Sequence, residues 1–540
     1  MTFQRTIQIS SLALFLFLIF SAAFSVVDAL PLDFFLRLDP SLVLITVLSS
    51  RNYLLAFLPT AILLLLSPLF GRLFCGYICP MGTTLDGADW VFKAHRKNGN
   101  QSGRLRSLKY LLVLFLIGAS IFGVSFVFLA SPLSLITRFY GLMIHPLLAF
   151  LLDGSLRIIR PLSEWMDVNT FLLAQIKTPR FATQFFLLAF FISLFALARL
   201  SPRFWCRNLC PSGALLALLS RKSVIRRQVS DECTSCGLCV NVCPMNAVDS
   251  EEPGRTRHEE CLMCQSCSRI CPVNAISFSC RPRTGPGDPS RISASRRQFI
   301  AAGLCGAATA AVTLTGLQTS YGKEGPGRVA PAGLLRPPGS LPEFSFLSRC
   351  VRCGECMTAC PTNTLQPIWF KAGIQGLFSP AITPRRGVCN PECRNCGTVC
   401  PTGAISKLTK KERVWAKTGT AVIFRQKCLA WEHRKSCMVC DEVCPFKAVE
   451  FIKEPGNPVP VPQVVEEKCA GCGSCEYYCP VQNEAAIVVT PMGALRLAKG
   501  SHSEQGRRQG LRLSLKPAAD RGPAPKEAAP QTGTAPGFTE

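Results

Sequence analysis

The sequence is poor in charged residues. Asp, Glu, Lys and Arg make up only 17% of its 540 residues, whereas 48% are apolar and the mean hydropathy is +0.26. So apolar a composition excludes a disordered chain, and the length excludes a small disulfide-stapled secreted domain. At roughly 150 residues per domain, the length predicts three or four modules. The composition indicates that part of the chain lies in a membrane.

Acidic residues are the scarcer of the two charged classes. The chain has 34 Asp and Glu against 59 Lys and Arg, which gives a formal net charge of +25. An excess of positive charge can indicate a nucleic-acid partner, but basic residues also gather on the cytoplasmic flanks of membrane helices. We expect the second explanation, and no nucleic-acid partner.

Three cofactor signatures are missing from the sequence. No C-x-x-C pair is followed by histidine, so covalent c-type haem is not indicated. No G-x-G-x-x-G loop opens a helix after a predicted strand, and no flavin or molybdopterin motif is present. The sequence therefore gives no sign of haem, flavin or nicotinamide chemistry.

Five stretches are long and apolar enough to cross a bilayer, which takes roughly 17–25 helical residues. They are residues 7–27, 53–70, 110–130, 181–198 and 299–317. A sixth stretch, 133–151, is weaker because it contains Arg138, His145 and Pro146. We interpret it as a re-entrant or interfacial segment.

The basic residues predict an orientation. If the N-terminus is cytoplasmic and 133–151 does not cross, the cytoplasmic segments carry twice as many Lys and Arg as the outer ones. The fifth stretch is rich in Ala and Gly and follows Arg296 and Arg297, as in a twin-arginine export signal; an ordinary last helix is the alternative. Such a signal works only from the cytoplasm, so an even number of spans must precede it. No small-x-small cleavage site follows it, and we expect it to remain as an anchor.

The chain has 30 cysteines, and their spacing carries most of the information. Residues 233–244 read C-x2-C-x2-C-x3-C-P, and the pattern recurs 28 residues later. Three thiolates on one tight loop can bind three irons of a [4Fe–4S] cube, while the fourth cysteine of such a run ligates the other cluster in two-cluster ferredoxins. The pattern predicts that Cys243 joins the second run and Cys271 the first.

Four further runs follow the fifth stretch, one opening with C-x3-C and one with C-x8-C, and all six end in Cys-Pro. The six quartets are Cys233, Cys236, Cys239 and Cys243; Cys261, Cys264, Cys267 and Cys271; Cys350, Cys353, Cys356 and Cys360; Cys389, Cys393, Cys396 and Cys400; Cys428, Cys437, Cys440 and Cys444; and Cys469, Cys472, Cys475 and Cys479. They predict six [4Fe–4S] clusters. In the second half, neighbouring runs can pair, or the first run can pair with the last and the middle two with each other.

Zinc and disulfides are the competing explanations for these runs. Structural zinc favours two separated C-x2-C knuckles rather than four cysteines in one run with a trailing proline. Six repeats of one spacing would be an unusual pattern for disulfides. We therefore expect iron–sulfur clusters.

Two shorter motifs, each C-x3-C-P, directly follow predicted spans. They contain Cys75 and Cys79, and Cys206 and Cys210. Four thiolates could share one additional metal centre; alternatively they are redox-active thiols or pack structurally where the helices leave the bilayer. Cys280 and Cys305 belong to no motif.

Four spans with two C-x3-C-P motifs and a following two-cluster ferredoxin resemble a known family. It is the membrane-bound quinol dehydrogenase ferredoxin of periplasmic nitrate reductase systems, with its methylamine-utilisation relatives. The twin-arginine segment and its four cysteine runs resemble the exported polyferredoxin subunit of the same systems. The two are fused here, over residues 1–280 and 293–491.

The resemblance implies a function in electron transfer. Electrons would flow from the quinol pool of the bacterial inner membrane toward a periplasmic reductase or cytochrome, with the first ferredoxin domain cytoplasmic and the second periplasmic. Arg138 and His145 are candidates for a quinone site. We expect an electron-transfer subunit rather than a stand-alone enzyme. The alternatives are a redox-sensing or assembly protein and a catalytic oxidoreductase subunit.

The predicted fold is a membrane α-helical protein with four spans and an anchor helix, plus small α+β domains of the bacterial two-cluster ferredoxin type. The predicted domains are a membrane domain (1–220), a two-cluster ferredoxin (221–280), a linker with the twin-arginine-like segment (281–322), a four-cluster polyferredoxin (323–498) and a disordered tail (499–540).

Overall fold

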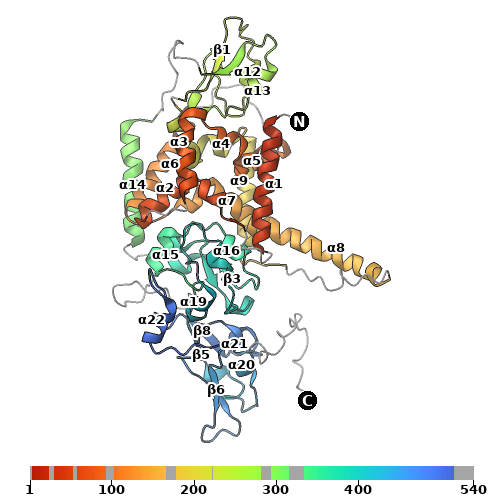
Figure 1. Cartoon of the computed structure of the whole chain (residues 1–540), viewed down its shortest axis with the longest axis vertical. Helices are drawn as coiled ribbons and strands as arrows, with labels where there is room; N and C mark the ends of the chain where they lie inside the picture. Colours follow the sequence, from red (N-terminus) through yellow and green to blue (C-terminus); the bar gives the residue numbers. More distant parts are fainter. Residues whose placement is uncertain are drawn as a thin grey trace.

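The computed structural model describes residues 3–23, 30–52, 57–92, 103–165, 178–221, 223–280, 294–314 and 334–515. Its long axis passes through three parts: a helical bundle in the middle, a small module at one end and a larger module at the other (Figure 1). Residues 281–293 and 315–322 of the predicted linker, and the tail beyond residue 515, lie outside the described residues.

The bundle consists of helices, most of them apolar. They are α1 (Phe3–Ala23), α2 (Pro40–Ser50), α3 (Leu58–Phe70), α4 (Leu73–Tyr77), α5 (Pro80–Val91), α6 (Gly103–Ile121), α7 (Pro132–Phe139), α8 (His145–Trp165), α9 (Gln184–Ala196), α10 (Phe204–Asn208), α11 (Pro211–Ser220) and α14 (Arg296–Leu314).

A buried carboxylate connects three of these helices. Asp39 caps the N-terminus of α2 and accepts the amide hydrogens of Ser41 and Leu42 at 3.0 and 3.2 Å. It also accepts the hydroxyl hydrogen of Ser131, the N-cap of α7, at 2.5 Å and that of Ser212 in α11. A buried charge needs such a full set of donors.

Among the described residues, three helices are long and apolar enough to cross a membrane: Phe3–Ala22, Pro132–Leu156 and Arg296–Leu314. The first and third overlap the predicted spans 7–27 and 299–317 but begin a few residues earlier. The predicted spans 53–70 and 181–198 contain only the shorter apolar helices Leu58–Phe70 and Gln184–Arg199.

The predicted span 110–130 ends early for a local reason. At the end of α6, the amide of Gly123 donates to Ser120 O and that of Val124 to Ala119 O, which is a Schellman motif. Gly123 has φ +80°, a conformation that favours glycine. The Gly123 turn therefore stops the helix, and an apolar but irregular segment follows.

The weak segment 133–151, expected to be re-entrant or interfacial, forms one continuous helix. α7, a π-helical turn (Tyr140–Ile144) and α8 follow one another directly. Pro146 lies in the first turn of α8, where its missing amide hydrogen does not break the helix. Length and composition thus make this segment a candidate span, although α8 runs sideways out of the bundle in Figure 1.

Each end module is built on short antiparallel strand pairs. In the small module, β1 (Arg226–Val229) pairs with β2 (Ile276–Ser279), with Arg226 opposite Ser279. The two helices α12 (Leu238–Val242) and α13 (Ser266–Ile270) lie between these strands in the sequence. The strand pair thus places the chain just before the first cysteine run beside the chain just after the second run.

The larger module repeats this plan. β3 (Leu365–Pro367) pairs with β4 (Pro380–Ile382), β5 (Thr420–Ile423) with β8 (Ile487–Thr490), and β6 (Val449–Ile452) with β7 (Val461–Val464). Its helices are α15 (Glu343–Arg349), α16 (Glu355–Thr358), α17 (Gly373–Gly376), α18 (Asn395–Thr398), α19 (Lys410–Trp415), α20 (Val439–Glu442), α21 (Ser474–Tyr477) and α22 (His502–Arg508).

Both modules contact the bundle. In the larger module, Ser348 O and Val351 O each accept a hydrogen bond of 2.7 Å, from Ser49 in α2 and Ser134 in α7. One contiguous apolar core includes Leu142 of the bundle and Phe346 of α15. The small module is held through Glu260, as described below.

The predicted disordered tail begins too early. Residues 499–515 are described, and α22 packs against α19. Ser501 caps α22, and the carboxylate of Glu412 in α19 accepts the amide hydrogens of His502 and Ser503 at 2.5 and 3.2 Å. These caps satisfy the first turn of the helix, a signal that composition alone does not contain.

Candidate metal centres

The standard cysteine runs share one loop conformation. In each, the residues on both sides of the second cysteine have positive φ. The four pairs are Ser235 and Gly237, Met263 and Gln265, Arg352 and Gly354, and Gly471 and Gly473. Left-handed residues are disfavoured for most side chains, so their recurrence shows that the loop is held in a tight curl. The third cysteine then lies in a short helix.

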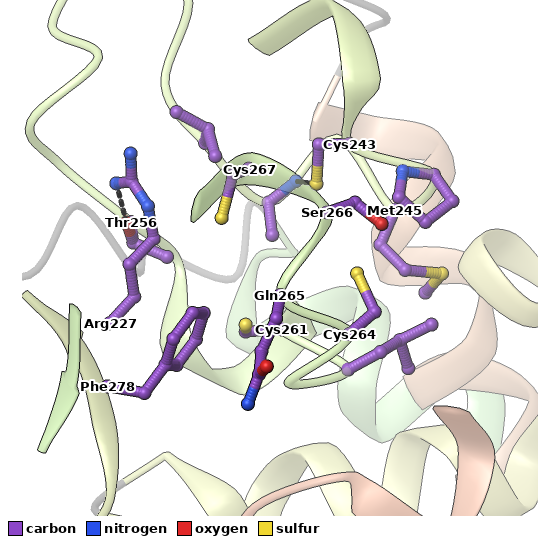
Figure 2. A pocket seen from close by; sticks show the side chains of 14 residues that line it. Arg227, Cys243, Met245, Thr256, Cys261, Cys264, Gln265, Ser266, Cys267 and Phe278 are labelled. Atoms are coloured by element: carbon purple, nitrogen blue, oxygen red, sulfur yellow. Dashed lines mark hydrogen bonds between the residues drawn. The ribbon is translucent and has the colours of Figure 1, made fainter. Parts of the chain in front are cut away.

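The second run receives its fourth thiol from the first, as predicted. Cys261, Cys264, Cys267 and Cys243 line one cavity (Figure 2). Cys243 ends α12, and its sulfur accepts the amide hydrogen of Ala247 at 3.3 Å. The charges of Cys233 and Cys236 act on the thiol of Cys239, so these three side chains lie close together. Cys271 packs against the buried apolar residues around Cys239.

In the larger module, neighbouring runs exchange their fourth cysteines. One cavity is lined by Cys469, Cys472, Cys475 and Cys444, and another by Cys428, Cys437, Cys440 and Cys479. The charges of Cys350, Cys353 and Cys400 act on the thiol of Cys356, so these four side chains lie close together. In the same way, the charges of Cys389, Cys393 and Cys360 act on Cys396. Of the two pairings left open above, the structure has the pairing of neighbours: in the larger module the first cysteine run pairs with the second run, and the third run with the fourth.

These four-thiol sets fit a cluster better than a single ion. In the part of the chain that the structure describes, no three Cys, His, Asp or Glu side chains converge as ligands of one metal ion. Structural zinc would require four ligand atoms at about 2.0–2.3 Å from one point. Burial raises the pKa of Cys261 to about 12 and that of Cys267 to about 11, so their thiolates need a positive partner such as iron.

An arginine that the spacing analysis missed contacts one of the wider runs. Arg413 in α19 donates from Nη2 to Cys389 Sγ at 3.2 Å and from Nε to Cys393 O at 2.7 Å. Burial raises the pKa of Cys389 and Arg413 lowers it; burial outweighs Arg413, and the pKa is raised to about 11. Hydrogen bonds and charge near the sulfurs set the reduction potential of a cluster.

The small module is attached to the bundle beside its second cysteine run. Glu260, directly before Cys261, is buried and accepts hydrogen bonds from Arg72 Nη1 at 2.7 Å and from Lys109 Nζ. Burial would raise the pKa of Glu260, but Lys109 and Arg72 outweigh it and hold the pKa below its ordinary value. The carboxylate is therefore charged and paired on both sides.

The two C-x3-C-P motifs come together in the bundle. Electrostatic interactions connect every pair among Cys75, Cys79, Cys206 and Cys210. Cys79 and Cys210 are the N-caps of α5 and α11, and Cys210 Sγ accepts the amide hydrogen of Gly213 at 3.2 Å. Segments 131 residues apart in the sequence thus face one another.

The two candidates for a quinone site differ in their surroundings. Arg138 is buried and donates to Arg352 O at 2.9 Å and Phe128 O at 3.2 Å, so it connects α7 to the loop between Cys350 and Cys353. His145 lies at the π-helical turn, and its Nδ1 is buried with no hydrogen-bond partner among the described residues.

Comparison with known proteins finds 4Fe–4S domains over most of these cysteine runs. A family described as a 4Fe–4S binding domain matches residues 53–99, 183–230 and 396–419, and the 4Fe–4S dicluster domain matches 232–275. Two more 4Fe–4S binding domain families match 346–366 and 466–482. The methylamine utilization ferredoxin-type protein MauM of Methylorubrum extorquens is 36% identical over 211 residues, which are 37% of this chain and 90% of MauM. The chain belongs to this family of ferredoxin-type proteins.

Relatives in this ferredoxin-type family include proteins with other names. NapG of Escherichia coli is 34% identical over 182 residues, which are 32% of this chain and 77% of NapG. NapF of Escherichia coli is 32% identical over 147 residues, 27% of this chain and 80% of NapF. With several 4Fe–4S domains and these relatives, the chain is an iron–sulfur protein of electron transfer that works with a redox partner.

Proposed function

We propose that the chain carries electrons, one at a time, from the quinol pool of the bacterial inner membrane toward a periplasmic reductase or cytochrome. Six [4Fe–4S] clusters on the 24 cysteines of the six quartets form the path. A cluster changes its charge by one electron without losing a ligand, so a row of clusters conducts electrons. The relatives are named for methylamine utilisation and as ferredoxin-type proteins, which supports a place in a respiratory chain.

The observation that carries this proposal is the position of the two cysteine-containing modules at the two ends of one apolar bundle (Figure 1). The small module contains two sets and the larger module four, and each is attached to the bundle next to a cysteine run. Glu260 precedes Cys261 at one end, and Arg138 contacts Arg352 between Cys350 and Cys353 at the other. This arrangement suits a protein that collects electrons in a membrane and passes them on outside it.

The proposed topology places the small module in the cytoplasm and the larger one in the periplasm. α14 starts at Arg296 on the side of the small module and ends at Leu314 on the side of the larger one (Figure 1). This direction suits a twin-arginine segment that stays in the membrane as an anchor. Quinol oxidation would take place in the bundle, where His145 is a candidate because its Nδ1 has no partner in the described part of the chain.

The decisive experiment uses the full chain, purified without oxygen in detergent. We expect at least about 24 iron and 24 acid-labile sulfide per chain, the amount that the six quartets bind, and an EPR signal of reduced [4Fe–4S] clusters. A quinol analogue should reduce a dye acceptor only when iron-loaded protein is present. Zinc without sulfide would refute the clusters. Bound clusters that a quinol analogue never reduces would refute the quinol donor and favour a sensing or assembly role.

A further inference from the structure

Two distant segments of the bundle carry the same residues at the same spacing. Residues 72–82 and 203–213 both read R-x2-C-x3-C-P-x-G. Their backbones match as well, because Cys79 N donates to Phe74 O at 3.0 Å and Cys210 N donates to Trp205 O at 2.9 Å. In both copies the proline begins a helix that the second cysteine caps. The bundle thus contains a structural repeat around its four cysteines.

The arginines of the two copies are exchanged. Arg203 Nη1 donates to Cys75 O at 3.3 Å and lies 3.6 Å from the position of a Cβ on Gly82. Arg72 reaches the other copy, where its Nη2 lies 2.7 Å from the position of a Cβ on Gly213. Both arginines are buried, with exposed fractions of 1% and 2%. Each copy therefore leaves room, through its glycine, for the guanidinium group of the other.

Four thiols and two guanidinium groups thus share one buried space. Cys79, Cys206 and Cys210 are buried, and Cys75 is half-buried. Another guanidinium nitrogen of each arginine pairs with a carboxylate: Arg72 Nη1 with Glu260, and Arg203 Nη2 with Asp86. These ion pairs fix the position of both guanidinium groups. Arg72 Nε is buried and has no hydrogen-bond partner in the described ranges. The charge of Arg72 acts on Cys75, Cys206 and Cys210, and that of Arg203 on Cys206, and a positive charge beside a thiol favours the thiolate form that binds iron.

This space adjoins the small module at its second cysteine run. A Cβ on Gly76, next to Cys75, would lie 2.6 Å from Leu262 O, so the two backbones touch. The hydroxyl group of Tyr77 donates to Met263 O at 3.0 Å. Leu262 and Met263 lie between Cys261 and Cys264, which line the cavity in Figure 2. At this contact only Gly76 and Leu262, the residues directly after Cys75 and Cys261, separate the two sets of thiols.

We propose that Cys75, Cys79, Cys206 and Cys210 together hold one further iron–sulfur cluster, which exchanges single electrons with the cluster site of Cys243, Cys261, Cys264 and Cys267. The inference rests on the proposed function, since it places this centre between the membrane donor and the small module. The transfer oxidises one cluster as it reduces the other, and no covalent bond forms or breaks. Two pseudo-equivalent halves that each supply two thiols explain why the motif occurs twice and why its arginines cross.

The test compares iron and sulfide in three variants of the full chain, purified without oxygen. The first is C75S/C79S, the second is C206S/C210S, and the third combines all four substitutions. If the halves share one cluster, each double variant loses the same iron and sulfide, about four of each for a cube, and the quadruple variant loses no more. Cys280→Ser is the matched control, because Cys280 is exposed and belongs to no set.

If the quadruple variant loses as much iron as the two double variants together, or if no variant loses iron, the shared cluster is overturned. Wild-type protein near 24 irons with unchanged variants refutes this inference alone, whereas wild-type protein without iron refutes the proposed function.

A second measurement needs no substitution. In native iron-loaded wild-type protein, the four thiols should resist alkylation until a chelator removes iron, while Cys280 reacts at once. Mass spectrometry of the peptides reads each site, and alkylation of all four in loaded protein would also overturn the inference.

Discussion

Arg413 places a permanent charge beside a ligand sulfur, and its effect can be measured. Its guanidinium group donates to Cys389 Sγ at 3.2 Å and to Asn390 O at 2.8 Å. The positive charge stabilises the reduced, more negative cluster, so Arg413→Gln should lower one midpoint potential. A charged hydrogen bond is worth about 1.5–3 kcal/mol, which corresponds to a shift of roughly 65–130 mV for one electron.

EPR-monitored redox titration measures this shift. Arg413→Lys is the control, because it keeps the charge but loses the fork of donors, and its shift should be the smaller one. Equal potentials in the wild type and Arg413→Gln would show that the cluster bound by Cys389 is not tuned by this contact.

Glu343 makes the stability of the larger module depend on pH. It is buried and accepts hydrogen bonds from Arg336 at 2.6 Å and from Arg496 at 2.8 Å. Burial would raise its pKa, but the two arginines outweigh this and hold the pKa of Glu343 below its ordinary value. A lowered pKa in the folded state stabilises the module above the unfolded pKa of about 4.3, and this stabilisation is lost as the pH falls through the folded pKa.

The expected result is a difference between wild type and Glu343→Gln that depends on pH. At pH 7 the variant should unfold more easily by about 3–5 kcal/mol, because it leaves buried arginines without a counter-charge. Below about pH 4 the difference should shrink as the wild-type carboxylate takes up a proton. Thermal unfolding between about pH 2 and 7 measures it, and a difference that stays constant down to the acid end would contradict the ion pairs.

At the scale of elements, α14 is attached to α6 through glycines rather than large side chains. A Cβ on Gly306 would lie 2.1 Å from Phe115 O, and one on Gly118 would lie 2.2 Å from Gly303 O. Small residues allow such close backbone contact between membrane helices. Gly306→Ala should therefore separate the helices, whereas Gly303→Ala should not, because a Cβ on Gly303 meets nothing within 4 Å.

Cysteine crosslinking between α6 and α14 in membranes measures this packing. We expect a crosslink between the two helices to form in wild type and Gly303→Ala and to weaken in Gly306→Ala. Equal crosslinking in both variants would mean that the helices are held by other contacts. It would also remove the support that this packing gives to α14 as a retained anchor.

The exchange of fourth cysteines between neighbouring runs makes a prediction about pairs of substitutions. Cys360 lies with Cys389, Cys393 and Cys396 rather than with its own run. Cys360→Ser and Cys393→Ser should each remove the same cluster, so the double variant should lose about four irons. Cys360→Ser with Cys353→Ser should lose about eight, because these residues belong to different clusters. The reverse pattern of iron loss would show that each run keeps its own fourth cysteine.

The sequence indicates which cysteines lie together because three of each set are close in the chain. The spacing places three thiols on one loop, and the structure joins Cys243 to the second run as expected. Helix lengths were predicted less well, since the turn at Gly123 depends on two backbone hydrogen bonds. The crossed arginines were missed because Arg72 and Arg203 meet only in the folded bundle, although the repeated R-x2-C-x3-C-P-x-G was a signal in the sequence.

At the scale of the whole molecule, the thiol sets at the two ends of the bundle should lie on opposite sides of the membrane. The small module is held to one end by Glu260 with Arg72 and Lys109, and the larger module to the other by hydrogen bonds to Ser49 and Ser134. Protease added to intact spheroplasts should therefore cut beyond residue 334 and spare 223–280, which should be cut only after lysis. Immunoblots against the two modules distinguish the fragments, and a cytoplasmic marker protein controls for leakage. Cleavage of both modules from outside would place all clusters on one side and remove any need for electrons to cross the bundle.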